Sequence, residues 1–576
     1  MAKAQEAEWT LLDWKNIQYK VSRLQSKIYQ ASLIGDKSSV VKYQKILINS
    51  YNAKLLAVKR VTQDNNGKRT AGVDGKKILN LEERIRLAEN LELDGKANPL
   101  KRIEIPKPNG KTRNLGIPTI EDRAKQALAK MALEPEWEAK FEPNSYGFRP
   151  GRSCHDAILA IELQVRRRTK YVLEADITGC FDNIKHEAII EKCNTFPTME
   201  RQIKAWLKSG VMIGDVFHQT EKGTPQGGVI SPLLANIALH GLETHISNKF
   251  PLRRTRIGQP KGKMKEITEA RLIRYADDFV VLHCEEETIK AAKIEVENWL
   301  KEIGLILNQG KTRICHTLKE YNGVKPGFDF LGFNIRTYNV GKYKSNKKVN
   351  GEPLMMLTKV KPSEKSVEKF IKNIKETLDK GHDKNPTLMM KRLSWIIRGW
   401  ANYFKTGSHS WETFGELERF RLGKIYLNWG RKRFAKKGLG YICKKIFHKT
   451  QRKASTFGWR EGKTTVTVPT LYEFGYTQHT KVQGTRSPYD GDWVYWTNRM
   501  KDYPQTPKDI KFGLKQQKGK CYICGQNLTV EDILEIHHID GNRNNNRNKN
   551  KAIVHNHCHD NHHRMTVSQK EVLDVA

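Results

Sequence analysis

The spacing of hydrophobic residues along this chain changes several times between strand-like and helix-like. Aspartates flank two of the short apolar runs. Asp176 closely follows the run Tyr171–Leu173, and Asp277 and Asp278 directly precede the run Phe279–Leu282. Apolar runs of this length are typical of buried β-strands. We therefore predict that the three carboxylates lie at strand ends or at a hairpin tip.

Longer segments have helical periodicity instead. Residues 1 to about 85 carry apolar side chains at helical spacing, among them Leu11, Ile17, Val21, Leu24 and Ile28. A helix is also predicted to start at Pro362-Ser363. Several lysines lie on one face of it, and the opposite face carries an apolar stripe of Val367, Phe370, Ile371, Ile374 and Leu378. The lysine face either solubilises the helix or contacts RNA, and further basic helices as far as Lys437 favour RNA.

Two segments rich in Gly and Pro lie near the aspartates in sequence. The segment 223–236 predicts a turn that enters an apolar helix, and its glycines let the backbone approach a substrate closely. The segment 105–118 places Lys107, Lys111 and Arg113 around an Asn-Gly turn. This pattern suits a hairpin that grips phosphates, although a plain exposed basic hairpin is the alternative.

Three neighbouring aspartates could bind the metal ions that phosphoryl transfer needs. Phosphoryl transfer from a nucleoside triphosphate uses two divalent ions about 4 Å apart, one at the attacking hydroxyl and one at the triphosphate. Mg²⁺ prefers hard oxygen ligands, which Asp supplies. An Asp-Asp pair alone is more often a solvated turn or a salt-bridged pair, so the companion motifs decide the interpretation.

Charge and composition limit the classes of molecule that this protein can be expected to bind. The 576 residues contain 102 Lys+Arg against 63 Asp+Glu, a formal net charge of +39, which favours an extended polyanion such as RNA or DNA. A hydrophobic content of 38% suffices for several cores, while a mean hydropathy of −0.66 and the lack of a long apolar run argue against an integral membrane protein. The first residues show no apolar signal region, so a cytoplasmic location is expected.

One basic segment is interleaved with aromatic residues. Stacking on nucleic acid would use Trp395, Trp400, Tyr403 and Phe404, but several apolar residues here recur at helical spacing, so core packing is the preferred interpretation for the aromatic stripe. The better candidates for RNA contact are Arg398, Asn402 and Tyr403.

The cysteines indicate zinc rather than disulfides. Six of the nine are scattered, whereas Cys521, Cys524 and Cys558 lie near the end of the chain. Together with His555 they form two pairs with two-residue spacers, suited to a tetrahedral zinc site. The neighbouring His557, His562 and His563 are alternatives for these positions.

Further polar residues lie between and just after these pairs of predicted zinc ligands. His537 and His538 follow an apolar pair, Asn550 comes next, and His559 and His563 are spaced to share one helical face. This order resembles an HNH endonuclease. A purely structural zinc knuckle is the alternative.

Taken in order, these motifs resemble the reverse transcriptases encoded by group II introns. The resemblance also rests on the segments Thr70–Gly75, Asn144–Ser153, Gly304–Thr312 and Arg398–Phe404. It implies a multidomain α+β protein with right-hand polymerase fingers and palm, a helical thumb or domain X, and a small zinc-stapled ββα-metal (HNH) domain. The expected parts are an N-terminal extension, fingers and palm, thumb/maturase domain X, a DNA-binding region and the HNH endonuclease, at residues 1–85, 86–345, 346–449, 450–510 and 511–576.

The resemblance also implies roles for the polymerase residues. Asp176, Asp277 and Asp278 would bind two Mg²⁺ ions, Lys107, Lys111 and Arg113 would contact the triphosphate, and Lys311 would help pyrophosphate leave. Phe181 resembles the aromatic gate that excludes a ribose 2′-hydroxyl, with a palm-core residue as the alternative. Gln226 resembles the residue beside the incoming nucleotide.

In the HNH domain the resemblance implies catalysis by His538, Asn550 and His559. His538 matches the general base, Asn550 the central asparagine, and His537, His559 and His563 the positions around one divalent ion, taken as Mg²⁺. The asparagine-rich loop 542–550 departs from the glycine-rich loop of relatives.

The implied partners are a group II intron RNA, double-stranded target DNA and deoxynucleoside triphosphates, in a bacterial, nucleoid-associated setting without a membrane; a homodimer stays open. The implied activity joins reverse transcription, splicing assistance and nicking of target DNA to prime synthesis during retrohoming. The alternatives are a splicing maturase with inactive polymerase and nuclease sites, or a reverse transcriptase-nuclease that acts without an intron.

Overall fold

The structure is a computed structural model, and it describes Trp9 and residues 11–562. Gaps fall at residues 65, 78, 107–111, 215, 225–226, 257–263, 268, 349–350, 382–384, 451–452, 463, 504–505, 529–531, 543–544, 557 and 560–561. Within this part, every helix is too short or too polar to cross a bilayer.

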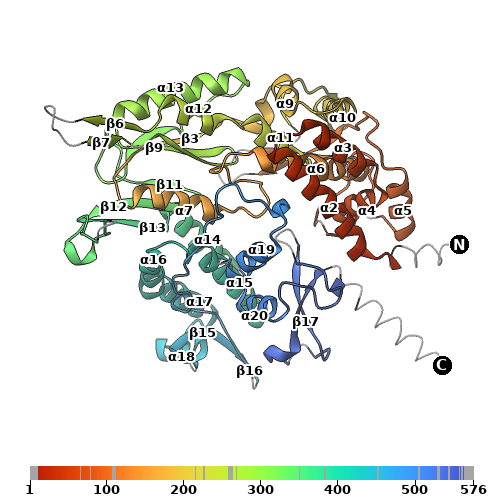
Figure 1. Cartoon of the computed structure of the whole chain (residues 1–576). Helices are drawn as coiled ribbons and strands as arrows, with labels where there is room; N and C mark the ends of the chain where they lie inside the picture. The colour runs from red at the N-terminus through yellow and green to blue at the C-terminus, as the bar shows by residue number, and fades with distance from the viewer. Residues whose placement is uncertain are drawn as a thin grey trace, which may run out of the picture.

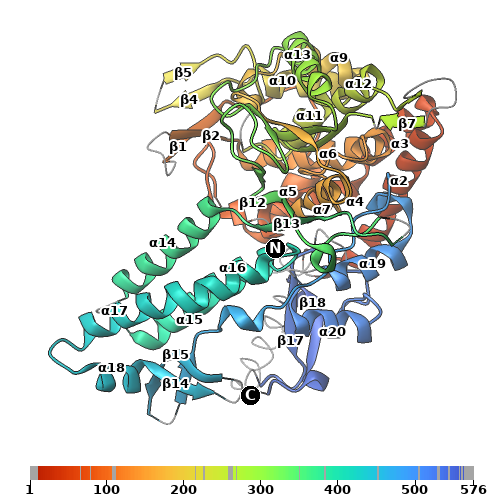
Figure 2. The same cartoon turned by 90° about the vertical axis from the view of Figure 1, so that its left-hand side faces the viewer.

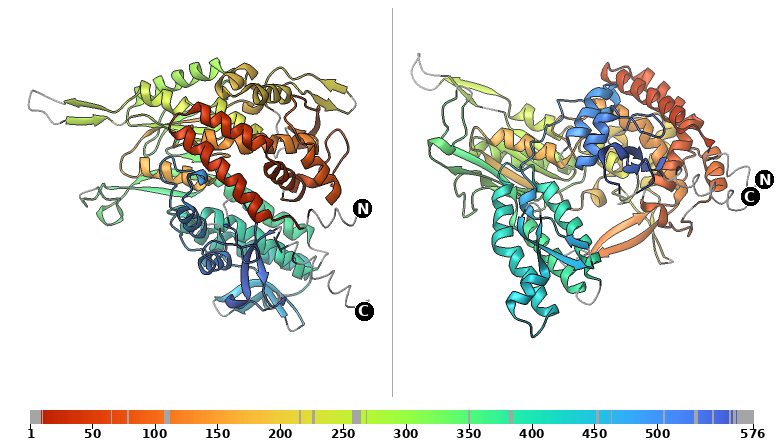
Figure 3. Two further views of the ribbon diagram at one scale, coloured as in Figure 1. Left: turned by 45° about the vertical axis from the view of Figure 1, so that its right-hand side comes forward. Right: turned by 90° about the horizontal axis from the view of Figure 1, so that it is seen from below.

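Helices form the N-terminal part, as the periodicity predicts. They are α2 (Trp14–Leu33), α3 (Lys37–Asn49), α4 (Tyr51–Lys59) and α5 (Leu81–Glu89). Asp13 caps α2 by accepting a hydrogen bond from the Asn16 backbone N–H. The first three pack against α6 (Ile120–Lys140), and α5 continues past the expected limit at residue 85. In Figure 3 these red helices lie across one side of the molecule.

A four-stranded antiparallel sheet forms the palm. Its strand order is β10 (Arg313–His316), β3 (Tyr171–Asp176), β9 (Asp278–His283) and β8 (Arg271–Tyr275). The helices α12 (Leu242–Lys249) and α13 (Glu286–Glu302) cover one face, and α7 (Cys154–Val165) lies on the other (Figure 1). The two strands predicted around the aspartates are confirmed. Beyond α12, a hairpin of β6 (Arg253–Arg256) and β7 (Met264–Ile267) projects from the palm (Figure 3).

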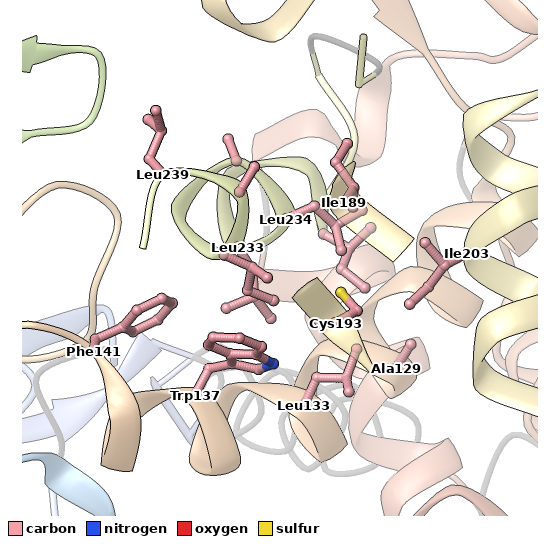
Figure 4. Packing of buried hydrophobic residues seen from close by; sticks show 14 of the residues in the cluster. Ala129, Leu133, Trp137, Phe141, Ile189, Cys193, Ile203, Leu233, Leu234 and Leu239 are labelled. Atoms are coloured by element: carbon pink, nitrogen blue, oxygen red, sulfur yellow. The ribbon is translucent and has the colours of Figure 1, made fainter. Parts of the chain in front are cut away.

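The fingers combine a second sheet with helices. The sheet order is β2 (Thr112–Ile117), β1 (Leu100–Pro106), β4 (Val211–Ile213) and β5 (Val216–His218). The helices are α8 (Cys180–Asn183), α9 (His186–Cys193), α10 (Pro197–Leu207) and α11 (Ser231–Ala238). Figure 4 shows their core, where Trp137 and Leu133 of α6 face Leu233 of α11 and Cys193 of α9. The apolar helix predicted after residue 223 is α11.

Residues 328–335 form a hairpin between palm and thumb. Strands β11 (Phe328–Phe330) and β12 (Phe333–Asn339) pair antiparallel, and β13 (Met356–Pro362) adds a third strand. Leu331 (φ 48°) and Gly332 (φ 82°) both adopt the left-handed conformation of a tight two-residue turn. A leucine gives no sequence signal for that conformation, so the pattern of residues does not reveal the turn.

The thumb is helical. It contains α14 (Glu364–Lys380), α15 (Pro386–Phe404), α16 (Ser410–Glu416), α17 (Gly423–Arg433) and α18 (Leu439–Ile446), which Figure 2 shows as a separate lobe below the palm. Ser363 caps α14, and Phe370, Ile371, Ile374 and Leu378 are buried along one stripe, as predicted.

The C-terminal part begins with the sheet β14 (Phe447–Thr450), β15 (Lys453–Glu461) and β16 (Thr464–Thr467). Helices α19 (Trp493–Asp502) and α20 (Lys508–Gln516) follow, and then the antiparallel pair β17 (Leu534–His538) and β18 (Lys551–His555). The expected limits at residues 449 and 510 fall inside β14 and α20, so neither is a break between elements.

Candidate active sites

The three aspartates of the palm meet at one edge of the sheet. Asp176, the last residue of β3, lies directly opposite Asp278, the first residue of β9. Asp277 belongs to the two-residue turn between β8 and β9, where Ala276 has φ 57°. The predicted placement at a strand end and a hairpin tip is confirmed.

A buried network supports that turn. Arg274 donates through Nη1 to Asn236 Oδ1 (3.0 Å) and to the carbonyl of Ala276 (3.2 Å), and Asn236 donates to the carbonyl of Gly147 (2.8 Å). A Cβ on Gly147 would lie 2.3 Å from the Ala276 nitrogen, so only glycine fits there. The segment around Ser145 thus lies beside β8 like a further strand.

Arg274 was not predicted to matter. Its side chain is only 1% exposed, although an arginine within a strand pattern normally signals an outward-facing residue. The sequence offered one signal, because the arginine stands between the apolar pair Leu272-Ile273 and Tyr275.

Two polar residues hold the Asp176 carboxylate. Lys311 Nζ lies 2.8 Å from Asp176 Oδ2, and Asn308 Nδ2 donates to the same oxygen at 3.1 Å. The backbone N–H of Asn308 also bonds the Asp176 carbonyl. Lys311 is therefore at the site as predicted, whereas Asn308 was missed.

Burial raises the pKa of the Asp278 carboxyl to about 7, and the neighbouring Asp277 and Asp176 carboxylates add to this effect. Three acids at one sheet edge repel each other unless cations compensate them. This donor set of carboxylate oxygens fits Mg²⁺.

Phe181 lies beside the aspartates on the short helix α8. Its ring is half-buried and meets the ring of Phe148 edge to face, with 6.2 Å between centroids. Phe148 is 53% exposed and has φ 56°. A second aromatic residue, missed by the sequence interpretation, therefore lines the position predicted for the sugar gate.

The remaining substrate-binding candidates are only partly described. Lys107, Lys111 and Gln226 lie outside the described residues. Arg113 pairs with Ile105 in the β1–β2 ladder, which confirms the predicted hairpin strands. Next to Gln226, the backbone N–H of Thr224 donates to the Phe181 carbonyl, and a Cβ on Gly227 would lie 2.7 Å from the Gly116 carbonyl. Thr224 therefore contacts α8, and Gly227 contacts β2.

A second centre occupies the C-terminal domain. Cys521, Cys524, His555 and Cys558 bring their ligand atoms within 4.8 Å of one another. Nδ1 of His555 faces the sulfurs, and its Nε2 lies 3.4 Å from Asp532 Oδ2, a carboxylate that orients the ring. Three thiols and an imidazole suit tetrahedral Zn²⁺. The predicted group of four is thus brought together, and its alternatives His557 and His563 lie outside the described residues.

The histidines predicted for the nuclease divide between two faces of β17. His537 contacts the rings of His559 (5.3 Å) and His562 (4.8 Å). Glu535, two residues before His537, accepts a hydrogen bond from His559 Nδ1 at 2.6 Å. His538 points to the opposite face, since successive strand side chains alternate. Glu535 is an addition to the predicted set, whereas His562 was already an alternative in the sequence interpretation.

Asn550 organises the loop after β17. Its amide donates to Asp540 Oδ1 (2.7 Å) and to the Asn545 carbonyl (2.9 Å), and its oxygen accepts from the Asp540 N–H. Hydrogen bonds from Asn545 and from the backbone hold the Asp540 pKa below its usual value. Within the described chain, Nε2 of His538 is enclosed and has no hydrogen-bond partner.

The three RNA-contact candidates on α15 differ in exposure. Arg398 is exposed, and Asn402 is half-buried and accepts from Lys405 Nζ. Tyr403 is half-buried, stacks on Phe333 and donates its hydroxyl to the Leu331 carbonyl, so its side chain packs against the β11–β12 hairpin. Trp400 stacks on Phe370, in agreement with core packing, whereas Trp395 is 67% exposed.

Comparisons with known proteins fit this geometry. Residues 9–91 match the N-terminal domain of reverse transcriptase, residues 105–335 match reverse transcriptase (RNA-dependent DNA polymerase), and residues 367–447 match the group II intron, maturase-specific domain.

Individual relatives cover parts of the chain. Protein YkfC of Escherichia coli is 33% identical over 311 residues, which are 48% of this chain and 78% of that protein. The group II intron-encoded protein LtrA of Lactococcus lactis is 33% identical over 313 residues, 44% of this chain and 50% of LtrA. Maturase-like protein 1 of Euglena gracilis is 25% identical over 399 residues, 68% of this chain and 76% of that protein.

Proposed function

Because this chain belongs to the family of group II intron reverse transcriptases and maturases, we propose that it copies RNA into DNA at the aspartate edge of the palm, assists splicing of its intron RNA and nicks target DNA with its C-terminal domain. The observation that carries the polymerase proposal is the pairing of Asp176 with Asp278 beside Asp277. Retrohoming of the intron would join the three activities.

Asp176, Asp277 and Asp278 would hold two Mg²⁺ ions, which supply activation of the primer 3′-hydroxyl and charge neutralisation at the triphosphate. Asn308 fixes the Asp176 carboxylate through its side chain and backbone. Lys311 places a cation next to the position where negative charge grows during transfer. Arg274 holds the turn that carries Asp277.

Selection of deoxynucleotides would fall to Phe181. A ring at this position clashes with a ribose 2′-hydroxyl, and Phe148 limits how far that ring can turn away. Lys107, Lys111, Arg113 and Gln226 would complete the nucleotide site from the fingers.

Assistance to splicing would use the basic faces of the thumb. Opposite its buried stripe, α14 exposes Lys365, Lys369, Lys372 and Lys375, and α15 exposes Arg398. Exposed cations on neighbouring helices suit the phosphates of a folded RNA, whose binding would weaken steeply with salt.

Nicking would use the histidines around β17. His538 would act as the general base, because its Nε2 has no hydrogen-bond partner among the described residues and could turn towards water. His537, His559 and Glu535 would offer ligands for one divalent ion on the other face of the strand. Zn²⁺ held by the Cys₃His group would stabilise the domain. Loop 542–550, held by Asn550, lies at the His538 end of the strand.

Primer extension on an RNA template with Mg²⁺ and deoxynucleotides tests the polymerase proposal. Wild type should synthesise cDNA and the double variant Asp277→Asn/Asp278→Asn should not, while Glu287→Gln, an exposed acid on α13, should match wild type. Synthesis by the double variant would contradict the assignment. If wild type is also inactive, a maturase without polymerase activity becomes the better account.

A further inference from the structure

A groove runs along α2 and has walls from three distant parts of the chain. Its widest part, ≈850 Å³, lies between α2 and the residues Lys520 and Gly525–Asn527 of the C-terminal domain. Two further hollows continue it along the helix, and Ser26 lines all three. Trp493 of α19 borders the first two. In Figures 1 and 2 α19 lies next to and below α2.

Direct contacts fix the walls relative to each other. Gln526, which is buried, donates through Nε2 to the carbonyl of Lys15 at 2.7 Å. The short helix Pro488–Asp490 packs against α2. The groove is therefore part of the folded molecule and needs no rearrangement to form.

The groove carries a net positive charge. Lys15, Arg23 and Lys27 are exposed on its α2 wall and Lys520 on the opposite wall, and none of the four has an ion-pair partner among the described residues. The two lining acids, Asp13 and Asp36, accept backbone N–H groups at the starts of α2 and α3 and keep their charge, so these four cations outnumber two carboxylates.

Aromatic side chains lie between these cations. Tyr19, 57% exposed, has the Arg23 guanidinium 5.7 Å from its ring centroid, and Trp493 lines the same part of the groove. Cations that follow a groove together with aromatic rings are the combination that binds single-stranded nucleic acid, with phosphates on the cations and bases on the rings.

We propose that this groove binds a single strand of the target DNA, with α2 as its third wall. DNA is favoured over RNA because the other two walls come from the region expected to bind DNA and from the domain proposed to nick it. The inference rests on the proposed function in one respect, that DNA reaches the C-terminal domain. A DNA strand held along α2 would extend from that domain towards the fingers.

Photocrosslinking locates the strand. Single-stranded DNA containing 5-bromodeoxyuridine, and RNA of the same sequence containing 5-bromouridine, are irradiated with the full-length protein, and the crosslinked peptides are identified by mass spectrometry. DNA attached to the peptide with Tyr19 or to Trp493 is expected. RNA attached there in preference to DNA, or neither strand attached, would overturn the proposal.

Equilibrium binding supplies a second measurement. The variant Lys15→Ala/Arg23→Ala/Lys27→Ala should bind the DNA strand at least 10-fold more weakly near 0.15 M salt, and its log–log salt slope should fall by about 2, since each lost phosphate contact removes about 0.7. The matched control Lys20→Ala/Lys208→Ala/Lys301→Ala loses the same charge from exposed sites outside the groove and should change binding less than about 2-fold.

Equal effects of the two triple variants would mean that DNA binding depends only on the net charge of the protein. That result would overturn the proposal that DNA binds in the groove. Both variants should keep wild-type melting temperatures and cDNA synthesis, which separates loss of binding from misfolding. Binding and crosslinking need no enzymatic turnover. An enzymatically inactive wild type would therefore contradict the proposed function, while the binding and crosslinking results would still test DNA binding in the groove.

Discussion

The rings of Phe148 and Phe181 meet edge to face, with their centroids 6.2 Å apart, beside the aspartate edge of the palm. Phe148 comes from the segment that runs alongside β8, and Phe181 from the helix that follows β3. The two segments that frame the aspartates therefore also frame the position proposed for the sugar of the incoming nucleotide.

Replacing Phe181 by Ala should admit ribonucleotides, because the ring that excludes a 2′-hydroxyl is gone. We expect discrimination between deoxy- and ribonucleotides to fall at least 10-fold in primer extension. Phe148→Ala should give a smaller loss, since Phe181 then has room to turn away. Unchanged discrimination in Phe181→Ala would assign this ring to the palm core.

Gly147→Ala should abolish cDNA synthesis. Its Cβ would lie 2.3 Å from the Ala276 nitrogen and would push the turn that carries Asp277 out of place, and displacements of about 1 Å at a reacting centre cost on the order of 100-fold in rate. Gly341→Ala is the matched control, because a Cβ there meets nothing within 4 Å and the backbone is extended. Wild-type rates in Gly147→Ala would show that the turn can shift without loss.

The stability of the palm should depend on the ionisation of Glu243. Burial, reinforced by Glu142, raises the pKa of Glu243 from 4.5 to about 7. The folded state then binds this proton more tightly than the unfolded state, so the free energy of unfolding should fall as pH rises from about 4.5 to about 7, by about 3 kcal/mol at most.

Urea unfolding between pH 5 and pH 8 measures this effect. Glu243→Gln should reduce the pH dependence in that window without abolishing it, because the raised pKa of Asp278 contributes there as well. The amide also loses one of the two hydrogen bonds from Asn144. Glu287→Gln, an exposed substitution, should leave the dependence as in wild type. A Glu243→Gln protein with the wild-type pH profile would assign the effect to another group.

The C-terminal domain should contain one zinc per chain. Metal analysis should find it in wild type and in Cys443→Ala, a cysteine outside the domain, but not in Cys558→Ala. Because structural zinc sites contribute on the order of 10 kcal/mol to the folding of small domains, loss of zinc should unfold β17 and β18 and abolish nicking. Synthesis of cDNA should persist, and a zinc content unchanged by Cys558→Ala would refute the assigned ligand set.

Removing Arg499 should loosen the region around α19 from the palm. Its guanidinium binds both oxygens of Asp156 (2.7 and 2.6 Å), and Asp156 is fully buried. The buried carboxylate would keep only its contacts with His479, Ser153 and the Val482 N–H, so the loss of the guanidinium should cost about 3 kcal/mol. Lys432→Ala, which breaks an exposed pair with Asp379, should cost less than about 1 kcal/mol in the same urea titration. Equal costs would mean that solvent reaches Asp156.

Local patterns predicted much of this molecule. The aspartates at the strand edge, the buried stripe of α14 and the Cys₃His group all follow from short-range spacing, because a strand end, a helix face and a pair of metal ligands are each defined within a few residues. The family resemblance supplied the order of the domains.

What the sequence could not supply depends on contacts between distant segments. Nothing near Arg274 in sequence shows that Asn236 and Gly147 will surround it, and nothing at Leu331 signals a left-handed turn. The alternation of His537 and His538 across β17 could have been foreseen from strand geometry, whereas the partnership of Glu535 with His559 needed the position of a helix 24 residues away.

The hydrogen bond from Gln526 to the carbonyl of Lys15 joins two segments that are synthesised far apart in time. The first long helix leaves the ribosome hundreds of residues before the segment that docks on it, so during translation its cationic face is open to any cellular polyanion. Only a chain synthesised beyond residue 527 closes that face into a groove. Early association with nucleic acid at α2 would therefore compete with docking of the C-terminal domain.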